Sequence, residues 1–328
     1  MACAIEDAGF QIRDQIMWIY GSGFPKSRNL QGEYEGWGTA LKPAHEPIVL
    51  ARKPLIGSVT TNVNSHGTGA INIDGCRVPT DEAPRAGAGV IPMRHDPSVP
   101  RGRSGEVSAQ ERYVDRGATN FAATPGPRGG DWRGRWPANV VHDGSDQVLA
   151  GFPFTRSGHL PADTPRGATG NGGKYGNRAP ITGPEYGENE GSAARFFYCA
   201  KASKADRDEG MEGFEPQAFV AFQTANGTSG KASSISEGRD TEYRNTHPTV
   251  KPTALMRWLV RLVTPADGLV LDPFMGSGST GKAAILEGFR FVGCELTADY
   301  MPIAQARIEH AAKQFAEANR QGALFLSG

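Results

Sequence analysis

The sequence predicts an α/β fold, and its most informative segment lies near the C-terminus. Residues 269–296 read LVLDPFMGSGSTGKAAILEGFRFVGCEL. An apolar run typical of a buried strand is followed by a glycine-rich turn, a helical stretch and a second apolar run that ends in a carboxylate. This order of elements is the smallest unit that holds an adenosine-containing ligand. At the other end of the chain, residues 10–20 (FQIRDQIMWIY) have the composition of a further strand.

The glycine-rich turn allows more than one interpretation. Gly276, Gly278 and Gly281 satisfy the G-x-G-x-x-G pattern of dinucleotide sites, and Glu295 ends the next strand as such a site requires. The turn also satisfies G-x-x-x-x-G-K, but Ala283 replaces the Ser or Thr that binds Mg²⁺ in a P-loop. A turn that serves only helix–strand packing is the simplest alternative for an isolated motif.

A third interpretation includes the residues around the turn. Asp272 ends the strand and Phe274 follows with an aromatic ring, while the glycines let a cofactor lie against bare backbone. Upstream, residues 247–252 (HPTVKP) lead into a stretch in which apolar residues recur at three- and four-residue spacing. This spacing predicts a helix over residues 253–263 with one apolar face, formed by Leu255, Trp258, Leu259 and Leu262.

The motif D-P-F-x-G-S-G at residues 272–278, preceded by H-P-T-x-K-P, resembles the β-class of S-adenosyl-L-methionine-dependent DNA methyltransferases. These enzymes act on the exocyclic amino group of adenine (N6) or cytosine (N4). Residues 10–54, 134–140 and 195–203 resemble further segments of phage and bacterial members, so the resemblance covers most of the chain. It implies S-adenosyl-L-methionine as the cofactor and double-stranded DNA as the partner.

The resemblance also implies which residues bind the cofactor. They come from the two motifs and from the end of the second strand: Thr249, Lys251, Pro252, Asp272, Pro273, Phe274, Gly276, Gly278 and Glu295. Glu295 would accept hydrogen bonds from the ribose hydroxyls, and the HPTVKP segment would border the methionine end.

The family's catalytic motif, D/N/S-P-P-aromatic, does not occur, because the sequence contains no Pro-Pro pair. In the family this motif accepts the protons of the target amine and stacks on the flipped-out base. We therefore predict no catalytic residue in this chain and expect an N-terminally truncated or split enzyme that is inactive alone. The helical pattern of residues 1–8, which has no capping residue before it, agrees with this expectation.

Two other function classes compete with this prediction. A non-catalytic remnant or accessory subunit would hold cofactor or DNA without transferring a methyl group. An NAD-dependent oxidoreductase would share the glycine pattern, but it would explain neither the HPTVKP segment nor the lack of further strand–helix units after Glu295.

The resembled fold is a Rossmann-like mixed sheet with strand order 3-2-1-4-5-7-6. Residues 10–54 would form the 6/7 hairpin and residues 268–296 strands 1 and 2, so the central strands would be missing. We expect exposed apolar strand surface and poor solubility or partial folding. The predicted parts are residues 1–56 (C-terminal part of the catalytic half), 57–245 (irregular target-recognition region and linkers) and 246–328 (cofactor-binding half).

The predicted recognition region holds most of the chain's turn signals. Residues 60–78 and 136–141 have the patterns of its better-ordered pieces, and residues 158–191 and 209–245 are expected to be mobile parts or linkers. Between residues 94 and 135, eight arginines accompany five acidic residues, which indicates a DNA contact or a solvated loop.

Composition limits the remaining possibilities. Lys and Arg number 35, as do Asp and Glu, so any DNA contact needs a local basic stripe rather than a basic protein. Four single cysteines argue against a zinc site or a disulfide framework, and we expect each to be a small core residue. No apolar run reaches membrane length and no signal-peptide pattern occurs, so we expect a cytoplasmic protein without metal or membrane partner.

Overall fold

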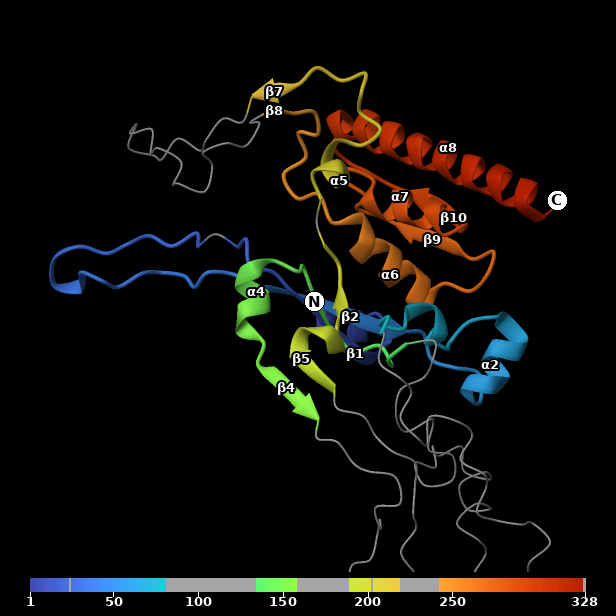
Figure 1. The fold of residues 1–328 in the computed structure, drawn as a ribbon, viewed down its shortest axis with the longest axis horizontal. Helices are drawn as coiled ribbons and strands as arrows, with labels where there is room; N and C mark the ends of the chain where they lie inside the picture. Colours follow the sequence, from blue (N-terminus) through green and yellow to red (C-terminus); the bar gives the residue numbers. More distant parts are fainter. Residues whose placement is uncertain (24, 81–133, 158–188, 202, 219–241, 327–328) are drawn as a thin grey trace, which may run out of the picture. The chain divides into compact units, whose positions relative to one another are not determined.

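The computed structural model describes residues 1–23, 25–80, 134–157, 189–201, 203–218 and 242–326. These residues form two compact units, each with its own sheet and hydrophobic core (Figure 1). The first unit comprises residues 1–65 and 77–198, and the second comprises residues 66–76 and 199–328. The functional division at residues 56/57 and 245/246 stays a prediction.

The first unit is built on a four-stranded sheet with the order β2-β1-β3-β6. Strand β1 (Gln11–Ile19) pairs antiparallel with β2 (His45–Arg52), which confirms the hairpin expected within residues 10–54. Pro47 is tolerated because β2 is an edge strand, where a missing N–H need not break the sheet. Strand β3 (Val140–His142) runs parallel to β1.

Smaller elements complete the first unit. Helix α1 (Ala2–Asp7) starts without a side-chain cap, as its sequence predicts. The others are α2 (Val59–His66), α4 (Asp146–Gly151), β6 (Tyr198–Cys199), the antiparallel pair β4 (Phe154–Ser157) and β5 (Asn189–Ser192), and the 3-10 turns η1 (Gly32–Tyr34) and η3 (Ala193–Phe196). Its core contains Ile16 and Trp18 of β1 and Val141 of β3.

The second unit contains the predicted strand–turn–helix–strand segment. Strand β9 (Leu269–Asp272) leads through the turn to helix α7 (Ser279–Leu286) and then to β10 (Arg290–Gly293), which pairs parallel with β9. Helix α6 (Thr253–Val263) spans the predicted residues, and α7 packs against both α6 and α8 (Met301–Leu326). The short elements are η2 (Asp74–Cys76), α5 (Lys204–Asp208), β7 (Gln217–Ala218), β8 (Glu242–Tyr243) and η4 (Ala298–Tyr300).

The prediction that the β9 strand is buried is wrong for one of its faces. Leu269 is 54% and Leu271 62% exposed, and Val292 of β10 is exposed beside them. Successive residues of a strand face opposite sides, and the opposite side here packs on α7, where the Phe291 ring lies against Gly281. Within the described part of the chain β9 pairs only with β10, so apolar strand surface is exposed as the resemblance implied.

Two further expectations are corrected. Of residues 209–245, expected to be mobile, Met211 and Asn245 are instead packed inside the second unit with no exposed surface, and residues 219–241 lie outside the described residues. Only Cys76 is a core cysteine, whereas Cys3, Cys199 and Cys294 are exposed.

The arginines between residues 94 and 133 and the expected mobile residues 158–188 lie outside the described residues. No helix in the described ranges is long and apolar enough to cross a membrane.

Candidate functional site

The candidate site lies at the carboxyl edge of the β9–β10 pair. Asp272 stands opposite Gly293 in the parallel register, so the two strands end side by side. The Cys294 N–H donates to the Asp272 carbonyl at 2.9 Å, and the Met275 N–H donates to the Cys294 carbonyl at 3.0 Å. These bonds bring Glu295 next to the glycine-rich turn, at the edge where open α/β sheets bind ligands.

The Glu295 carboxylate is held by the backbone of its own surroundings. It accepts hydrogen bonds from the N–H of Thr297 and from the N–H of Gly276, each at 2.8 Å. These two bonds hold the pKa of Glu295 below its ordinary value. The site therefore keeps a negative charge at neutral pH, and each oxygen retains a lone pair for a ligand hydroxyl.

Asp272 and Phe274 form the open side of the turn. The Phe274 N–H donates to Asp272 Oδ1 at 3.0 Å, which fixes the carboxylate beside the strand end. The Phe274 ring is 88% exposed, and the neighbouring Pro273 is exposed as well. An exposed aromatic ring beside two carboxylates fits a flat ligand that also carries hydroxyl groups.

The HPTVKP segment reaches the turn through His247. A Cβ added at Gly276, where φ is +50°, would lie 2.6 Å from His247 Nε2, so only glycine allows this approach. The Thr249 N–H donates to His247 Nδ1 at 3.3 Å, and the ring packs edge-on against Tyr300 at 4.6 Å. His247 is part of the HPTVKP motif, but the sequence predicted no role for its side chain.

The charge state of His247 follows from the same contacts. Burial lowers the pKa of His247, and the nearby Glu295 carboxylate opposes that shift without cancelling it. The imidazole is therefore neutral at pH 7, and because Nδ1 accepts a hydrogen bond, the proton sits on Nε2, on the side of the turn.

The other predicted residues of this segment differ in how far they are buried. Thr249 is exposed, Lys251 is half-buried, and Pro252 is buried as the N-cap of α6. The structure therefore brings the segment to the turn, and the ligand roles of these three residues stay predictions.

Gly278 serves packing rather than an open surface. Its φ is +74°, and a Cβ there would lie 2.9 Å from the Cα of Ala304 in α8. Gly281 is likewise closed in, since a Cβ would lie 2.5 Å from Ile308 Cδ1. The packing interpretation thus explains these two glycines, whereas Gly276, which is also buried, contacts His247 and donates its N–H to Glu295.

Lys282 cannot act as a P-loop lysine. Its side chain is 1% exposed, and its Nζ donates to Glu209 Oε2 at 2.7 Å. A phosphate ligand would have to displace this buried partner, so the structure disfavours the nucleotide-hydrolase interpretation on grounds that are independent of Ala283.

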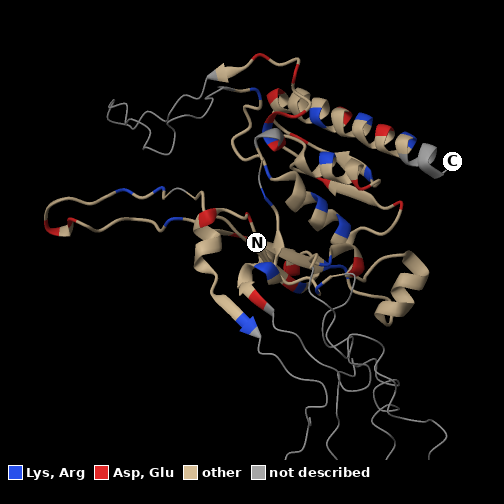
Figure 2. Cartoon of the chain, viewed as in Figure 1, with Lys and Arg blue, Asp and Glu red and all other residues tan. Residues whose placement is uncertain are grey.

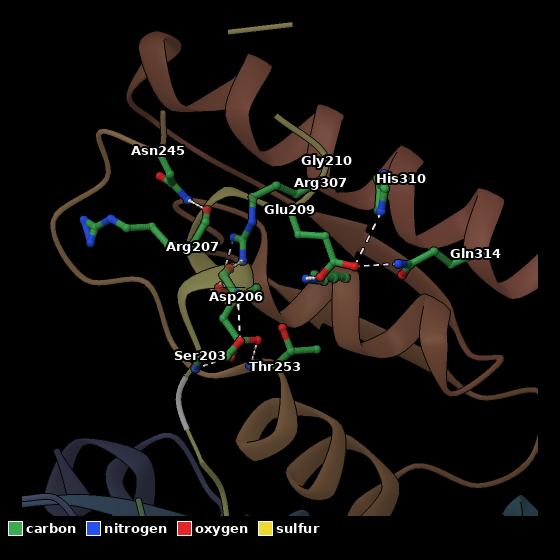
Figure 3. A network of polar contacts seen from close by, with 12 residues as sticks. Ser203, Asp206, Arg207, Glu209, Gly210, Asn245, Thr253, Arg307, His310 and Gln314 are labelled. Carbon is green, nitrogen blue, oxygen red and sulfur yellow. Dashed lines mark hydrogen bonds and ion pairs between the residues drawn. The ribbon is translucent and has the colours of Figure 1, made fainter. Parts of the chain in front are cut away.

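A short segment, Ser203–Asp208, holds the parts of the site together, and we call it the hub (Figure 3). Ser203 and Asp206 form a capping box, in which the Asp206 N–H donates to Ser203 Oγ and the Ser203 N–H donates to Asp206 Oδ2. Asp206 Oδ1 also accepts from the Thr253 N–H at 2.9 Å, at the start of α6. The S-x-x-D pattern at residues 203–206 is the sequence signal that could have identified this cap.

The hub also binds the chain that carries His247. Asn245 Nδ2 donates to the Arg207 carbonyl at 2.9 Å, and the Asn245 N–H donates to Asp208 Oδ1 at 3.0 Å. In return, Arg207 Nη2 donates to the His247 carbonyl at 2.9 Å. The loop before the HPTVKP motif is therefore fixed by hydrogen bonds, with the buried Asn245 at its centre.

Metal ligands do not gather in the described ranges, where no group of three or more His, Cys, Asp or Glu side chains could hold an ion.

Known proteins are similar in sequence to part of this chain. Residues 168–306 match the family model described as "DNA methylase". The type II methyltransferase M.ScaI of Streptomyces caespitosus is 39% identical over 75 residues, which are 23% of this chain and 25% of that protein. The DNA adenine methyltransferase YhdJ of Escherichia coli (strain K12) is 40% identical over 76 residues, 23% of this chain and 26% of that protein.

A solved structure, the M1.HpyAVI-SAM complex, is 41% identical over 19% of this chain and 31% of that chain, with a TM-score of 0.19. The chain spans about a quarter of the length of the curated relatives it matches. Residues 168–306 are thus similar to the DNA methylase family.

Proposed function

We propose that this chain, with its DNA methylase segment, binds S-adenosyl-L-methionine and belongs to an enzyme that methylates the amino group of adenine (N6) or cytosine (N4) in DNA. The observation that carries the proposal is the meeting of both predicted motifs at one edge of the β9–β10 pair. There the Gly276 N–H binds Glu295, and His247 lies against Gly276.

The residues present fit this cofactor. The half-buried Glu295 carboxylate suits the ribose hydroxyls, and the exposed Phe274 ring suits the adenine face. Gly276 anchors the Glu295 carboxylate through its N–H, and Thr249 and Lys251 supply a hydroxyl and a cation for the methionine end. The cofactor supplies an electrophilic methyl group, and the role of these side chains is to hold and orient it.

The second candidate function is that of a non-catalytic subunit that binds cofactor or double-stranded DNA. It is favoured by one observation, the lack of a Pro-Pro pair in the sequence. An aromatic amine needs acceptors for its protons before it attacks the methyl group, and the family's motif supplies them.

A methyl-transfer assay separates the two functions. The chain is incubated with mixed-sequence duplex DNA and labelled cofactor, with and without a fragment that carries a D/N/S-P-P-aromatic motif. Transfer only with the fragment supports a divided enzyme, transfer by the chain alone overturns the predicted inactivity, and DNA binding without transfer in both arms supports the non-catalytic subunit.

Calorimetric titration tests the cofactor directly. We expect S-adenosyl-L-methionine to bind and NAD and ATP to give no heat of binding under the same conditions. Glu295→Ala should weaken cofactor binding about 10-fold or more, because a charged acceptor is lost. Glu317→Ala, an exposed acid on α8, is the matched control and should leave the affinity unchanged. Preferential binding of NAD would reject the proposal.

A further inference from the structure

Arg307 of α8 lies behind the glycine-rich turn, and it is fully buried. Its Nη1 donates to the Ser277 carbonyl, to Ser277 Oγ at 3.0 Å and to Ser279 Oγ at 3.2 Å. Its Nη2 donates to the Asp206 carbonyl of the hub at 2.6 Å (Figure 3). One guanidinium therefore joins three segments that are far apart in the sequence.

This arginine stays charged although it is buried. Burial lowers its pKa to about 10, and the nearby Asp206, Glu209 and Asp208 oppose that shift. Its side chain donates to carbonyl and hydroxyl oxygens of Ser277, Ser279 and Asp206. A well-packed apolar side chain would commonly be as stable at such a place. Its position therefore points to a role in setting geometry.

The turn is held from two sides at adjacent residues. On the ligand side, the Gly276 N–H is bound by Glu295. On the inner side, the Ser277 carbonyl is bound by Arg307. The first bond fixes the peptide plane before Gly276 and the second fixes the plane after Ser277, so together they orient the Gly276–Ser277 peptide that lies between them.

We propose that Arg307 is a positioning residue for the cofactor turn: it holds the Ser277 carbonyl from behind and couples the turn to the hub through the Asp206 carbonyl. This inference rests on the proposed function for its ligand, and the hydrogen bonds among the turn, α8 and the hub carry the geometry. The hub in turn holds α6 and His247, so Arg307 aligns both motifs of the site.

Arginine suits this task better than lysine. Nη1 reaches the turn while Nη2 reaches the hub, and the planar fork keeps the two directions fixed. A lysine keeps the charge but has a single nitrogen, which cannot serve both segments from one position. Arg307→Lys is thus a variant that separates positioning from charge.

The first test is hydrogen exchange of the unliganded chain at a temperature where each variant is folded. In Arg307→Lys, the amides of residues 276–279 should exchange about 10-fold faster or more than in the unaltered chain. Exchange at residues 255–262 of α6 should change less. Arg320→Lys, an exposed arginine on the same helix, is the matched control and should exchange like the unaltered chain.

The second test is calorimetric titration with S-adenosyl-L-methionine under the same conditions. Arg307→Lys should bind about 10-fold more weakly or worse, while Arg320→Lys binds normally. If Arg307→Lys does not fold, the double variant Ser277→Ala, Ser279→Ala replaces it, because it removes only the two hydroxyl acceptors. We expect a smaller effect of the same sign in both tests.

The outcomes distinguish the two proposals. If the unaltered chain does not bind the cofactor, the proposed function fails, and the exchange result alone decides on Arg307. If the variant exchanges uniformly faster, or its turn exchanges like that of the unaltered chain, Arg307 has a merely structural role and the inference is overturned. If Arg307→Lys binds S-adenosyl-L-methionine with an affinity within about twofold of the unaltered chain, the inference is overturned as well.

Discussion

At the scale of single residues, the Asp206 carboxylate links the starts of two helices, α5 and α6. It accepts hydrogen bonds from the backbone of Thr253 and from the backbone and hydroxyl of Ser203. Asp206→Asn would remove the charge and one acceptor from two helix starts. We expect it to lower the free energy of unfolding by about 1–2 kcal/mol, measured by denaturant titration at pH 7. Glu317→Gln should have no measurable effect.

The same residue predicts how stability depends on pH. Burial alone would raise the pKa of Asp206, but the bonds from Thr253 and Ser203 outweigh it, and the pKa lies below the ordinary 3.8. A lowered folded-state pKa adds stability above the ordinary value, and that stability is lost as the pH falls through the folded-state value. In acid denaturation Asp206→Asn should therefore lose less stability below pH 3.8 than the unaltered chain. If the free energy of unfolding falls with pH equally in Asp206→Asn and in the unaltered chain, the lowered pKa of Asp206 is contradicted.

Residue-level prediction from the sequence depended on how local each signal is. The turn residues and Glu295 are found because strand, turn and strand are contiguous. Arg307 was not predicted because its contact with the Asp206 carbonyl joins residues 101 positions apart, and no local pattern reports such a partner. The Asp206 cap had a local signal, the S-x-x-D pattern, which was not used. The P-loop interpretation of Lys282 was already weakened by Ala283, and the structure adds that Lys282 pairs with Glu209.

At the scale of elements, the glycine-rich turn depends on its close approach to α8. Gly278→Ala would place a Cβ 2.9–3.0 Å from Ala304 at a φ of +74°. The left-handed conformation costs about 1–2 kcal/mol and overpacking adds about 1–3 kcal/mol. We expect a loss of more than 2 kcal/mol in thermal or denaturant unfolding. The control is Gly213→Ala, whose Cβ meets nothing within 4 Å and which should change stability little.

Truncating a side chain on the open face of the β9–β10 pair should cost less stability than truncating one on the buried side of helix α6. Leu271→Ala, on the open face, should cost less than about 1 kcal/mol, because that leucine is already 62% exposed. Leu255→Ala, which truncates a 2% exposed side chain of α6, should cost about 2–5 kcal/mol. Denaturant titration of the two variants compares them directly, and equal losses would show that the open face is covered in solution.

At the scale of the whole molecule, periodic segments were predicted well. The bounds of α6 follow from its apolar spacing and from Pro252, and the β1–β2 hairpin was implied by the family resemblance of residues 10–54. The parallel pairing of β3 with β1 was not predicted, because a three-residue strand more than 120 positions away carries no local signal of its partner. Burial of β9 was mispredicted because apolarity specifies what a strand can bury and not which faces are covered.

The two compact units should unfold in two separate steps. Each has a separate core, Ile16, Trp18 and Val141 in one and Leu255, Trp258 and Ile303 in the other. Separate cores unfold separately unless a large interface couples them, so we expect two calorimetric transitions. Val141→Ala should lower one transition and Leu255→Ala the other, because each removes contacts from a single core.

The ligand then identifies the transition that contains the site. S-adenosyl-L-methionine at about 100 times its dissociation constant should stabilise the second unit by about 2.7 kcal/mol, because it binds only the folded form. The transition lowered by Leu255→Ala should therefore move to higher temperature, and the one lowered by Val141→Ala should stay in place. A shift of both transitions would show that the units are energetically coupled, and a shift of the Val141 transition alone would place the cofactor outside the β9–β10 edge.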